Sequence, residues 1–285
     1  MMQTKRHHAL NDVAFAQLRE QIERRSGLHF PAEKKYILEN RLGQRLKELQ
    51  LPSFEAYVSH LETRGGTDPE WDVLLNLVTT RETYFFRDPA QLTLFGKELL
   101  PQVIQDKKRR GEGVLRVLSA ACSSGDEVFT LAILLQEYGM WPMGMRWEVG
   151  GIDISPKAIE LAEEGIYGPY ALRHVPAELL GKYFEEVPGQ GMRPIAALRQ
   201  RVRFRRGNLM EASQVRNLGM ADLIFCRNVL IYFDAAAREK ILANLAQSLN
   251  PGGFIVTGFS ETPKHGIAGL EIKRFGSSAV YQKVG

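Results

Sequence analysis

Apolar and polar positions follow two different rhythms along the chain, and the change comes near residue 113. Beyond it, short apolar runs are separated by amphipathic segments, which is typical of a parallel sheet covered by helices. The apolar runs predict strands at 114–119, 147–154, 201–206, 221–226 and 253–259. The segments between them predict helices at 126–138, 156–164 and 235–249, and Gly276-Ser277-Ser278 predicts a closing hairpin of 270–275 with 279–283.

Residues 11–110 show helical periodicity instead. Asp12 can cap a first helix that carries apolar residues at 15, 18 and 22 on one face. A second helix, from about Pro31 to Leu49, has leucines at 38, 42, 46 and 49. Lys34, Arg41 and Arg45 lie together on one flank of that leucine stripe. This basic flank is either a solvated helix face or a docking surface for an acidic partner.

The same patterns suggest the domain organisation. We expect an N-terminal helical domain at 1–87, a linker helix segment at 88–112 that ends in a charged run, and a sheet domain at 113–285. Residues 178–206 do not fit the strand–helix alternation, because they contain several Pro and Gly and then arginines at 201, 203 and 205 that alternate with apolar residues. Period two indicates a strand with one charged face, so we predict a small β insertion at the sheet edge.

Composition narrows the function classes. The 285 residues are 44% hydrophobic and 25% charged, as in an ordinary globular protein. The net charge of +4 equals the surplus of ten Lys/Arg over six Asp/Glu in residues 1–50, which favours an acidic partner for that part over general nucleic-acid binding. Cys122 and Cys226 predict neither a disulfide nor a metal site. Without a signal peptide or a long apolar run, we expect a cytoplasmic protein that does not insert into membranes.

A candidate ligand site follows the first predicted strand. That strand runs into the small residues 119–125, and a helix then opens with Asp126 and Glu127. The second strand ends in Asp153, placed as an acid that holds ribose hydroxyls. However, the turn lacks the GxGxxG motif. In addition, acidic side chains occupy the first helical turn, where a pyrophosphate would need backbone amides without a nearby negative charge. A cationic ligand with a ribose, S-adenosylmethionine, fits this pattern better; the alternative is an ordinary strand–helix–strand unit whose turn needs small residues.

Four stretches resemble one family. They are TTRETYFFRD at 79–88, SAACSSGDE at 119–127, DLIFCRNVLIYF at 222–233 and FSE at 259–261. All are similar to motifs of the CheR-type chemoreceptor methyltransferases, and the resemblance covers roughly residues 12–283. It implies an α/β, Rossmann-like S-adenosylmethionine-dependent methyltransferase domain with a small β insertion, preceded by an all-α N-terminal domain. The implied activity is protein-glutamate O-methylation of the cytoplasmic helical bundle of chemoreceptors, with S-adenosylhomocysteine as product.

The resemblance also implies roles for individual residues. Cofactor contacts would come from Arg81, Thr83, Arg87, Glu127, Asp153, Asn208, Leu209, Arg227 and Asn228. Within that set, Asp153 would hold the ribose, Glu127 would lie near the methionine part, and Asn208 with Leu209 would border the adenine. Arg87, Arg227 and Tyr232 would be the catalytic residues, and Lys34, Arg41 and Arg45 would contact the acidic receptor surface.

The sequence departs from the family pattern in three places. Arg81 replaces the usual Asn, and DEVF at 126–129 replaces the usual Glu-Glu-Pro-Tyr. The segment 184–202 is shorter than the loop that some members use to dock on a C-terminal receptor peptide. We therefore expect that no such tether is needed. We also expect a monomer.

Two other functions remain open at this point. A nucleic-acid methyltransferase is one, although Arg227-Asn228-Val229 stands where amino-methylating enzymes carry Asn/Asp-Pro-Pro-aromatic. A non-catalytic module that binds the cofactor or a receptor is the other. Methylation of glutamate itself needs no general base, because that side chain has a pKa of about 4.3 and is ionised at pH 7.

Overall fold

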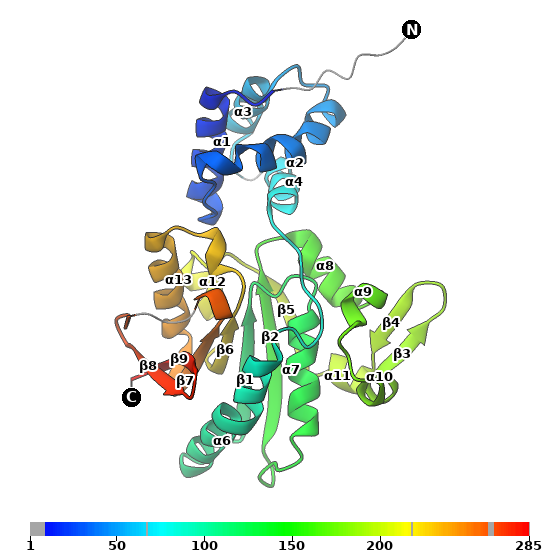
Figure 1. Cartoon of the computed structure of the whole chain (residues 1–285), viewed down its shortest axis with the longest axis vertical. Coiled ribbons are helices and arrows are strands. Elements are labelled where there is room, and N and C mark those ends of the chain that lie inside the picture. Colours follow the sequence, from blue (N-terminus) through cyan, green and yellow to red (C-terminus); the bar gives the residue numbers. More distant parts are fainter. Residues whose placement is uncertain (1–8, 67, 218, 262–264, 285) are drawn as a thin grey trace. The chain divides into compact units, whose positions relative to one another are not determined.

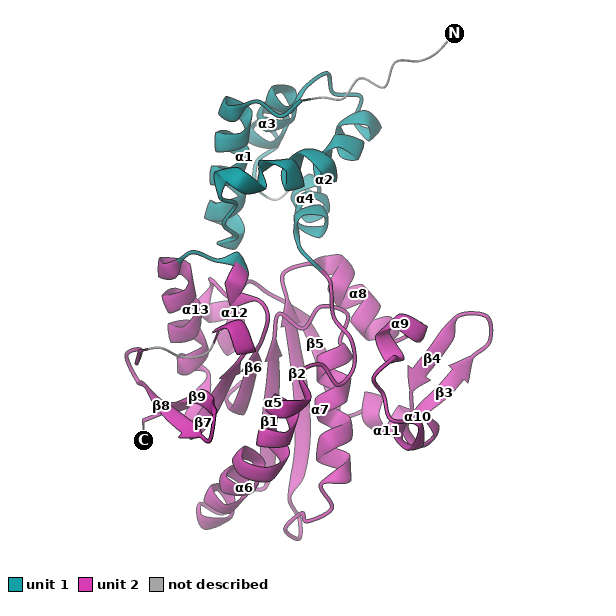
Figure 2. Cartoon of the chain, in the orientation of Figure 1, with its two compact units in different colours: residues 1–80, 232–234 teal, residues 81–231, 235–285 magenta. Residues whose placement is uncertain are grey.

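The computed structural model describes residues 9–66, 68–217, 219–261 and 265–284. The chain forms two compact units (Figures 1 and 2). Unit 1 comprises residues 1–80 with 232–234, and unit 2 comprises 81–231 with 235–285. No helix among the described residues is both long and apolar enough to cross a membrane.

Unit 1 is helical. Its elements are α1 (Asp12–Ser26), the 3-10 helix η1 (Ala32–Lys34), α2 (Lys35–Glu48), α3 (Phe54–Thr63) and α4 (Glu70–Val78). The predicted apolar faces are buried, with Phe15, Leu18 and Ile22 on α1 and leucines 38, 42 and 46 on α2. The cap of α1 is Asn11 rather than Asp12, because the Asn11 side chain accepts a hydrogen bond from the Ala14 amide at 2.8 Å.

Residues 88–112 pack on the sheet of unit 2 and are not a linker. They form α5 (Pro89–Leu94), the π-helix η2 (Phe95–Leu99) and α6 (Leu100–Arg109). Phe95, Leu99 and Leu100 belong to the core around the sheet, and Lys107 of the charged run is 2% exposed. The units divide between Thr80 and Arg81, earlier than the predicted boundaries, because the apolar face of this segment is covered by the sheet.

A seven-stranded sheet forms the core of unit 2, in the order β5-β2-β1-β6-β7-β9-β8. The strands are β1 (Val114–Ala120), β2 (Arg146–Asp153), β5 (Val202–Arg206), β6 (Ala221–Cys226), β7 (Leu249–Thr257), β8 (Leu270–Phe275) and β9 (Ser278–Lys283). The first five run parallel, and the predicted hairpin β8–β9 closes the sheet antiparallel to β7. Strand order reverses between β1 and β6, and such a reversal opens a ligand crevice at the carboxyl ends of the strands.

The β insertion is smaller than predicted. β3 (Phe184–Val187) and β4 (Gly191–Pro194) form a separate two-stranded antiparallel sheet, as Figure 1 shows. The arginine-bearing strand β5 instead pairs with β2 and forms the edge of the main sheet. Its period-two pattern could not distinguish these cases, since an edge strand and an inserted hairpin both leave one face exposed.

Short and long helices connect the strands. They are α7 (Asp126–Glu137), α8 (Pro156–Glu164), α9 (Pro169–Leu172), α10 (Ala177–Tyr183), α11 (Ala196–Arg199), α12 (Ala212–Arg216), η3 (Leu230–Tyr232), α13 (Ala235–Gln247) and η4 (Phe259–Glu261). The three long helices predicted in this half of the chain, α7, α8 and α13, are therefore confirmed. The short ones were not predicted, because segments of three to seven residues carry too little periodicity.

Candidate active site

The turn between β1 and α7 contains three residues in the left-handed backbone conformation. Ala121, Ser123 and Gly125 have φ angles of 60°, 48° and 87°. A Cβ atom on Gly125 would come within 2.9 Å of the Phe204 ring and 3.0 Å of the Ala162 side chain, so only glycine fits there. The turn is consequently held tightly against β5 and α8, with its backbone amides at the carboxyl edge of the sheet.

Asp153, the last residue of β2, lies under this turn. Its Oδ2 accepts a hydrogen bond from the Ser123 amide at 2.9 Å, and its Oδ1 accepts one from the Ser155 amide at 2.9 Å. Burial raises the pKa of this carboxyl group, while the amide hydrogen bonds oppose that rise. Both oxygens keep acceptor capacity, so the side chain is fixed in place and can still receive two hydroxyl donors.

Glu127 and Arg227 join two neighbouring strand ends. Glu127 accepts hydrogen bonds from the Ser119 hydroxyl at 2.7 Å and from Arg227 Nε at 2.6 Å. Arg227 Nη1 donates to the Arg87 carbonyl at 3.0 Å and to Gln91 Oε1 at 3.1 Å. The Arg227 side chain is 3% exposed. Its guanidinium group therefore ties the start of α7 to residues 87–91, and it holds Glu127 rather than facing solvent.

Glu261 shapes the loop after β6. Its carboxylate accepts hydrogen bonds from the amides of Asn228 at 2.8 Å, Ile231 at 3.0 Å and Gly258 at 2.9 Å. Asn228 has a φ of 58°, a conformation that such a bond helps to maintain. The sequence showed an acid soon after a strand, in FSE, but no spacing rule connects it with a loop 33 residues earlier.

Residues 81–88 lead into α5 beside this cluster. Phe85 is fully buried, and the Phe86 amide donates to the Thr130 hydroxyl at 3.1 Å. Arg87 Nη1 donates to the Glu82 carbonyl at 3.0 Å, and its guanidinium lies 5.6 Å from the Tyr84 ring centre. Arg81 is exposed and Thr83 is half-buried. The segment is thus anchored by its phenylalanines, while its polar side chains stay accessible.

The remaining predicted residues are placed less centrally. Asn208 forms a local turn, because its side chain accepts from the Met210 amide at 3.0 Å, and Leu209 beside it is buried. Tyr232 ends the 3-10 helix η3 and belongs to unit 1, where its carbonyl accepts from the His29 amide at 2.9 Å. Hydrogen bonds therefore connect Arg87, Arg227 and Glu127 in one cluster of unit 2, whereas Tyr232 is part of unit 1.

Asp126 is a candidate site residue to which the sequence analysis gave no individual role. It is 1% exposed, and burial raises the pKa of its carboxyl group to about 6. Its Oδ2 accepts from the Ser124 hydroxyl at 2.7 Å, whereas Oδ1 has no hydrogen-bond partner among the described residues. An acid in a first helical turn predicts a favourable dipole contact at the surface, and only the packing shows that this one is enclosed.

The predicted basic flank is largely internal to unit 1. Arg45 makes two hydrogen bonds to Glu70, at 3.0 and 2.5 Å, and the Tyr57 hydroxyl donates to the same carboxylate at 2.8 Å. These bonds raise the pKa of Arg45 above its usual value. Arg41 donates to the Val78 carbonyl and the Thr80 hydroxyl, whereas Lys34 is exposed. Arg41 and Arg45 therefore fasten α4 to α2 and are half-buried, and their contact with an acidic receptor stays a prediction.

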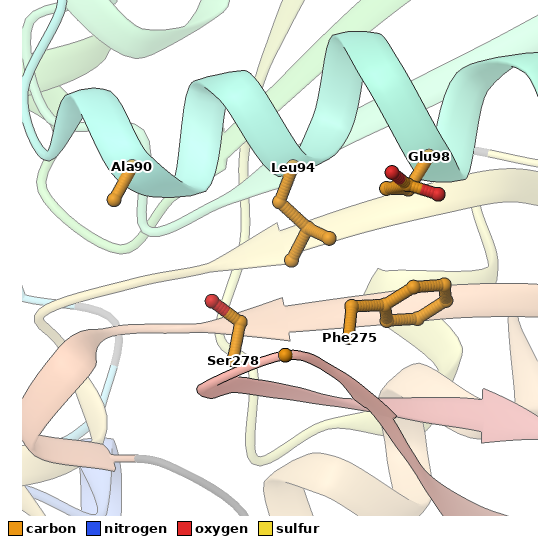
Figure 3. Close-up of a pocket in the computed structure, with 6 residues that line it drawn as sticks. Ala90, Leu94, Glu98, Phe275 and Ser278 are labelled. Atoms are coloured by element: carbon orange, nitrogen blue, oxygen red, sulfur yellow. The ribbon is translucent and has the colours of Figure 1, made fainter.

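A hollow on unit 2 lies apart from these residues. It is drawn in Figure 3, between α5–η2 and the β8–β9 turn, and is lined by Ala90, Leu94, Glu98, Phe275, Gly276 and Ser278. None of the predicted site residues lines it.

Comparison with known proteins decides the family. Residues 81–272 match the CheR methyltransferase SAM-binding domain, and residues 14–79 match the CheR methyltransferase all-alpha domain. The chain belongs to the CheR methyltransferase family. It is therefore an S-adenosylmethionine-dependent methyltransferase with an all-α domain followed by a Rossmann-like domain, as the sequence predicted.

Curated relatives match almost the whole chain. Chemotaxis protein methyltransferase 2 of Vibrio cholerae is 33% identical and covers 96% of this chain and 94% of its own. The chemotaxis protein methyltransferase of Salmonella typhimurium is 35% identical, over 92% of this chain and 88% of its own. That of Escherichia coli is 34% identical, over 93% and 90%.

The residues present fit S-adenosylmethionine. Asp153 offers a fixed carboxylate with spare acceptors at the end of β2, which suits a ribose diol. Glu127 brings an acid to the first turn of α7, and Asp126 lies next to it. A phosphate would be repelled by these acids, whereas a cationic ligand is favoured.

Proposed function

We propose that this methyltransferase acts in the cytoplasm as a monomer and methylates glutamate side chains on the cytoplasmic helical bundle of chemoreceptors. The names of its relatives, which are chemotaxis protein methyltransferases, support the choice of substrate. The observation that carries the chemistry is the hydrogen-bonded cluster of Glu127, Arg227 and the 81–91 segment, beside Asp153 at the carboxyl ends of β1, β2 and β6.

The reaction requires little acid–base catalysis from the protein. The substrate carboxylate is ionised at pH 7, since the pKa of glutamate is about 4.3. S-adenosylmethionine supplies a methyl group on a sulfonium cation. The protein then has to bring the two together, align them in a straight line and exclude water, and such proximity effects contribute roughly 7–11 kcal/mol.

Individual residues take distinct parts in that alignment. Asp153 binds the ribose, and Asn208 with Leu209 borders the adenine. Arg227 is a positioning residue, because its buried guanidinium holds Glu127 and the Arg87 backbone. The Arg87 side chain is half-exposed and can orient a carboxylate through charged hydrogen bonds. Arg81, Thr83 and Asn228 make further cofactor contacts, and Tyr232 is a catalytic residue.

A label-transfer experiment tests this function. Methyl-labelled S-adenosylmethionine is incubated with receptor-containing membranes, and the products are treated with alkali. A glutamyl methyl ester releases labelled methanol, whereas a methylated base keeps its label and a pure binding module transfers none. Asp153→Asn should abolish most of the signal, and Glu148→Gln on the exposed face of the same strand is the matched control. Alkali-stable label, or none in the wild type, would contradict the proposal.

The same assay tests the proposed independence from a receptor tether. The strands β3 and β4 are joined by only Pro188, Gly189 and Gln190. This short connection supports methylation without a C-terminal receptor peptide. Removing that peptide from the receptor should leave the rate unchanged, and a large drop would show that the hairpin docks it.

A further inference from the structure

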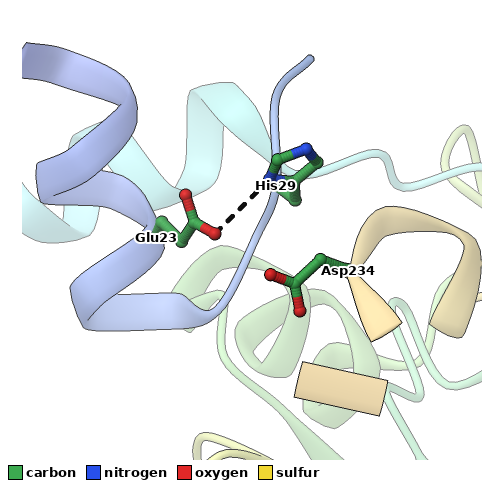
Figure 4. A group of neighbouring side chains, drawn as sticks. All are labelled: Glu23, His29 and Asp234. Carbon is green, nitrogen blue, oxygen red and sulfur yellow. Dashed lines mark hydrogen bonds and ion pairs between the residues drawn. The ribbon is translucent and has the colours of Figure 1, made fainter. Parts of the chain in front are cut away.

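Three side chains of unit 1 converge from two distant parts of the chain. Glu23 lies in α1, His29 follows that helix, and Asp234 belongs to the 232–234 segment of the same unit. One ligand atom from each lies within 4.8 Å of the other two, and Glu23 Oε1 is 3.4 Å from His29 Nδ1 (Figure 4). All three side chains are half-buried.

Backbone contacts hold the two segments together. Leu28 and Phe233 form an antiparallel β-bridge, and the His29 amide donates to the Tyr232 carbonyl at 2.9 Å. Gly27 ends α1 in the left-handed conformation, with its amide bonded to the Glu23 carbonyl at 2.7 Å. The three side chains therefore project from a backbone that is already ordered, which lowers the conformational entropy lost on binding a ligand.

We propose that Glu23, His29 and Asp234 bind a divalent transition-metal ion of the zinc type. One imidazole and two carboxylates form a ligand set that such ions accept, with a fourth position left for water. Ligand bonds of about 2.0–2.2 Å in a tetrahedron separate neighbouring ligand atoms by roughly 3.3–3.6 Å. The Glu23–His29 distance already has this value, and an oxygen of Asp234 lies within 4.8 Å of both ligand atoms.

An isolated His–Glu ion pair is the alternative, and unit 2 contains one for comparison. His265 Nε2 lies 3.8 Å from Glu239 Oε1 in an exposed pair. Among the described residues, that pair belongs to no group of three ligands. The two histidines thus differ in the third ligand, which makes His265 a matched control.

A bound ion would connect residues far apart in the sequence. It would join the end of α1 to a segment more than 200 positions later, between Tyr232 and the start of α13. Binding only to the folded state stabilises it, so zinc should raise the melting temperature. Because Tyr232 lies two residues before Asp234, occupancy would also restrain the turn that carries it.

The test uses the full chain with His7→Ala and His8→Ala, since adjacent histidines can bind zinc by themselves. Zn²⁺ is titrated against a chromophoric chelator, and melting is followed with and without the ion. The parent should bind one Zn²⁺ and melt at a higher temperature with it. His29→Ala, Glu23→Gln and Asp234→Asn should each weaken binding by about tenfold or more, as loss of even an outer-shell partner does.

The substitutions are chosen so that they preserve the fold. Glu23→Gln preserves the size of a half-exposed side chain, and Asp234→Asn preserves a residue that can cap α13. His265→Ala should bind Zn²⁺ like the parent. Failure of the parent to bind one ion, or binding by His29→Ala equal to that of the parent, would overturn the proposal. Unchanged binding by Asp234→Asn would also overturn it, because only two ligands would remain.

Discussion

The parallel strands of the seven-stranded sheet begin at one side of unit 2 and end at the other, and these two sides use buried charge in opposite ways. We call the side where the strands begin the closed edge and the side where they end the open edge. Where the strands begin, Lys107 is ion-paired with Asp222 at 2.9 Å and Glu112 at 2.6 Å. The Arg116 amide and the Asn250 side chain also donate to Asp222, at 2.8 and 2.7 Å. The Lys107 and Asp222 side chains are each 2% exposed, and their polar groups are mutually satisfied.

Where the strands end, the polar groups are only partly satisfied. One oxygen of the enclosed Asp126 and the Ser123 hydroxyl have no hydrogen-bond partner among the described residues. Two non-glycine residues of the turn, Ala121 and Ser123, are left-handed. Backbone strain and unmet polar groups cost stability and collect at functional sites. The comparison indicates that one edge stabilises unit 2, while the other gives up stability to keep binding capacity.

Disrupting the ion pair between Lys107 and Asp222 at the closed edge should have the largest effect on stability. Lys107→Met removes the buried ammonium group of this network and leaves the Asp222 carboxylate without that charge partner. We expect a loss of about 3–5 kcal/mol in the free energy of unfolding, measured by urea denaturation. Adding Asp222→Asn to Lys107→Met should restore part of it. A loss below about 1 kcal/mol would show that the edge is not a stabilising network.

A substitution at the open edge should instead increase the free energy of unfolding. The pKa of Asp126 is raised from 3.8 to about 6, so its ionised form is disfavoured in the folded state. Stability is lowered as pH rises from the unfolded pKa to the folded pKa, and the full cost is present above about pH 6. Asp126→Asn should therefore be more stable than the wild type by roughly 2–3 kcal/mol at pH 8 and equal to it near pH 3.

The pH dependence is the control for that variant. Denaturation at several pH values should show the difference growing between about pH 4 and pH 6. A stabilisation independent of pH would indicate that packing, and not ionisation, distinguishes the two side chains.

Binding capacity at the open edge depends on Asp153. Asp153→Ala should weaken S-adenosylmethionine binding by about 1.5–3 kcal/mol, as expected for losing charged hydrogen bonds. Calorimetric titration of the folded variant measures this change. Unchanged affinity would remove Asp153 from the cofactor site.

Some substitutions should impair the alignment of the two reactants, and therefore turnover, without impairing cofactor binding. Arg87→Ala and Tyr232→Phe should lower turnover by about 10–100-fold while changing cofactor affinity much less, because alignment is realised mainly in the transition state. Single-turnover methylation and calorimetry with the same preparations distinguish the two quantities. If both variants methylate at the wild-type rate, neither residue is catalytic.

The smallest effect is expected on unit 1, at an exposed charge that belongs to neither edge. Lys34→Glu should raise the KM for receptors a few-fold at low salt and leave cofactor binding unchanged, because exposed charges mainly govern encounter. Lys47→Glu, at another exposed position of α2, is the matched control. Identical kinetics for the two variants would assign receptor recognition to another surface. Arg45 is unsuitable for this test, because its removal would leave Glu70 buried without its ion-pair partner.

Local pattern was sufficient to predict the strands of the sheet and its long helices, and it pointed to a ligand-site candidate at the turn after β1. Alternation of apolar runs located β1, β2 and β6, and the small-residue turn together with the acid at the end of β2 pointed to Asp153 as the ribose-binding candidate. These features are encoded by neighbours in the chain: periodicity decides which face is buried, and a strand end decides where a side chain emerges.

Only the tertiary structure decided which charges are solvated. Arg45 and Lys107 look like exposed helix charges in the sequence, yet each is paired with a carboxylate 25 or 115 positions away. The same holds for Glu261 and the loop at Asn228, and for the neighbouring side chains of Glu23 and Asp234. The physical reason is that burial and ion pairing depend on which distant segments pack together, and no local period carries that information.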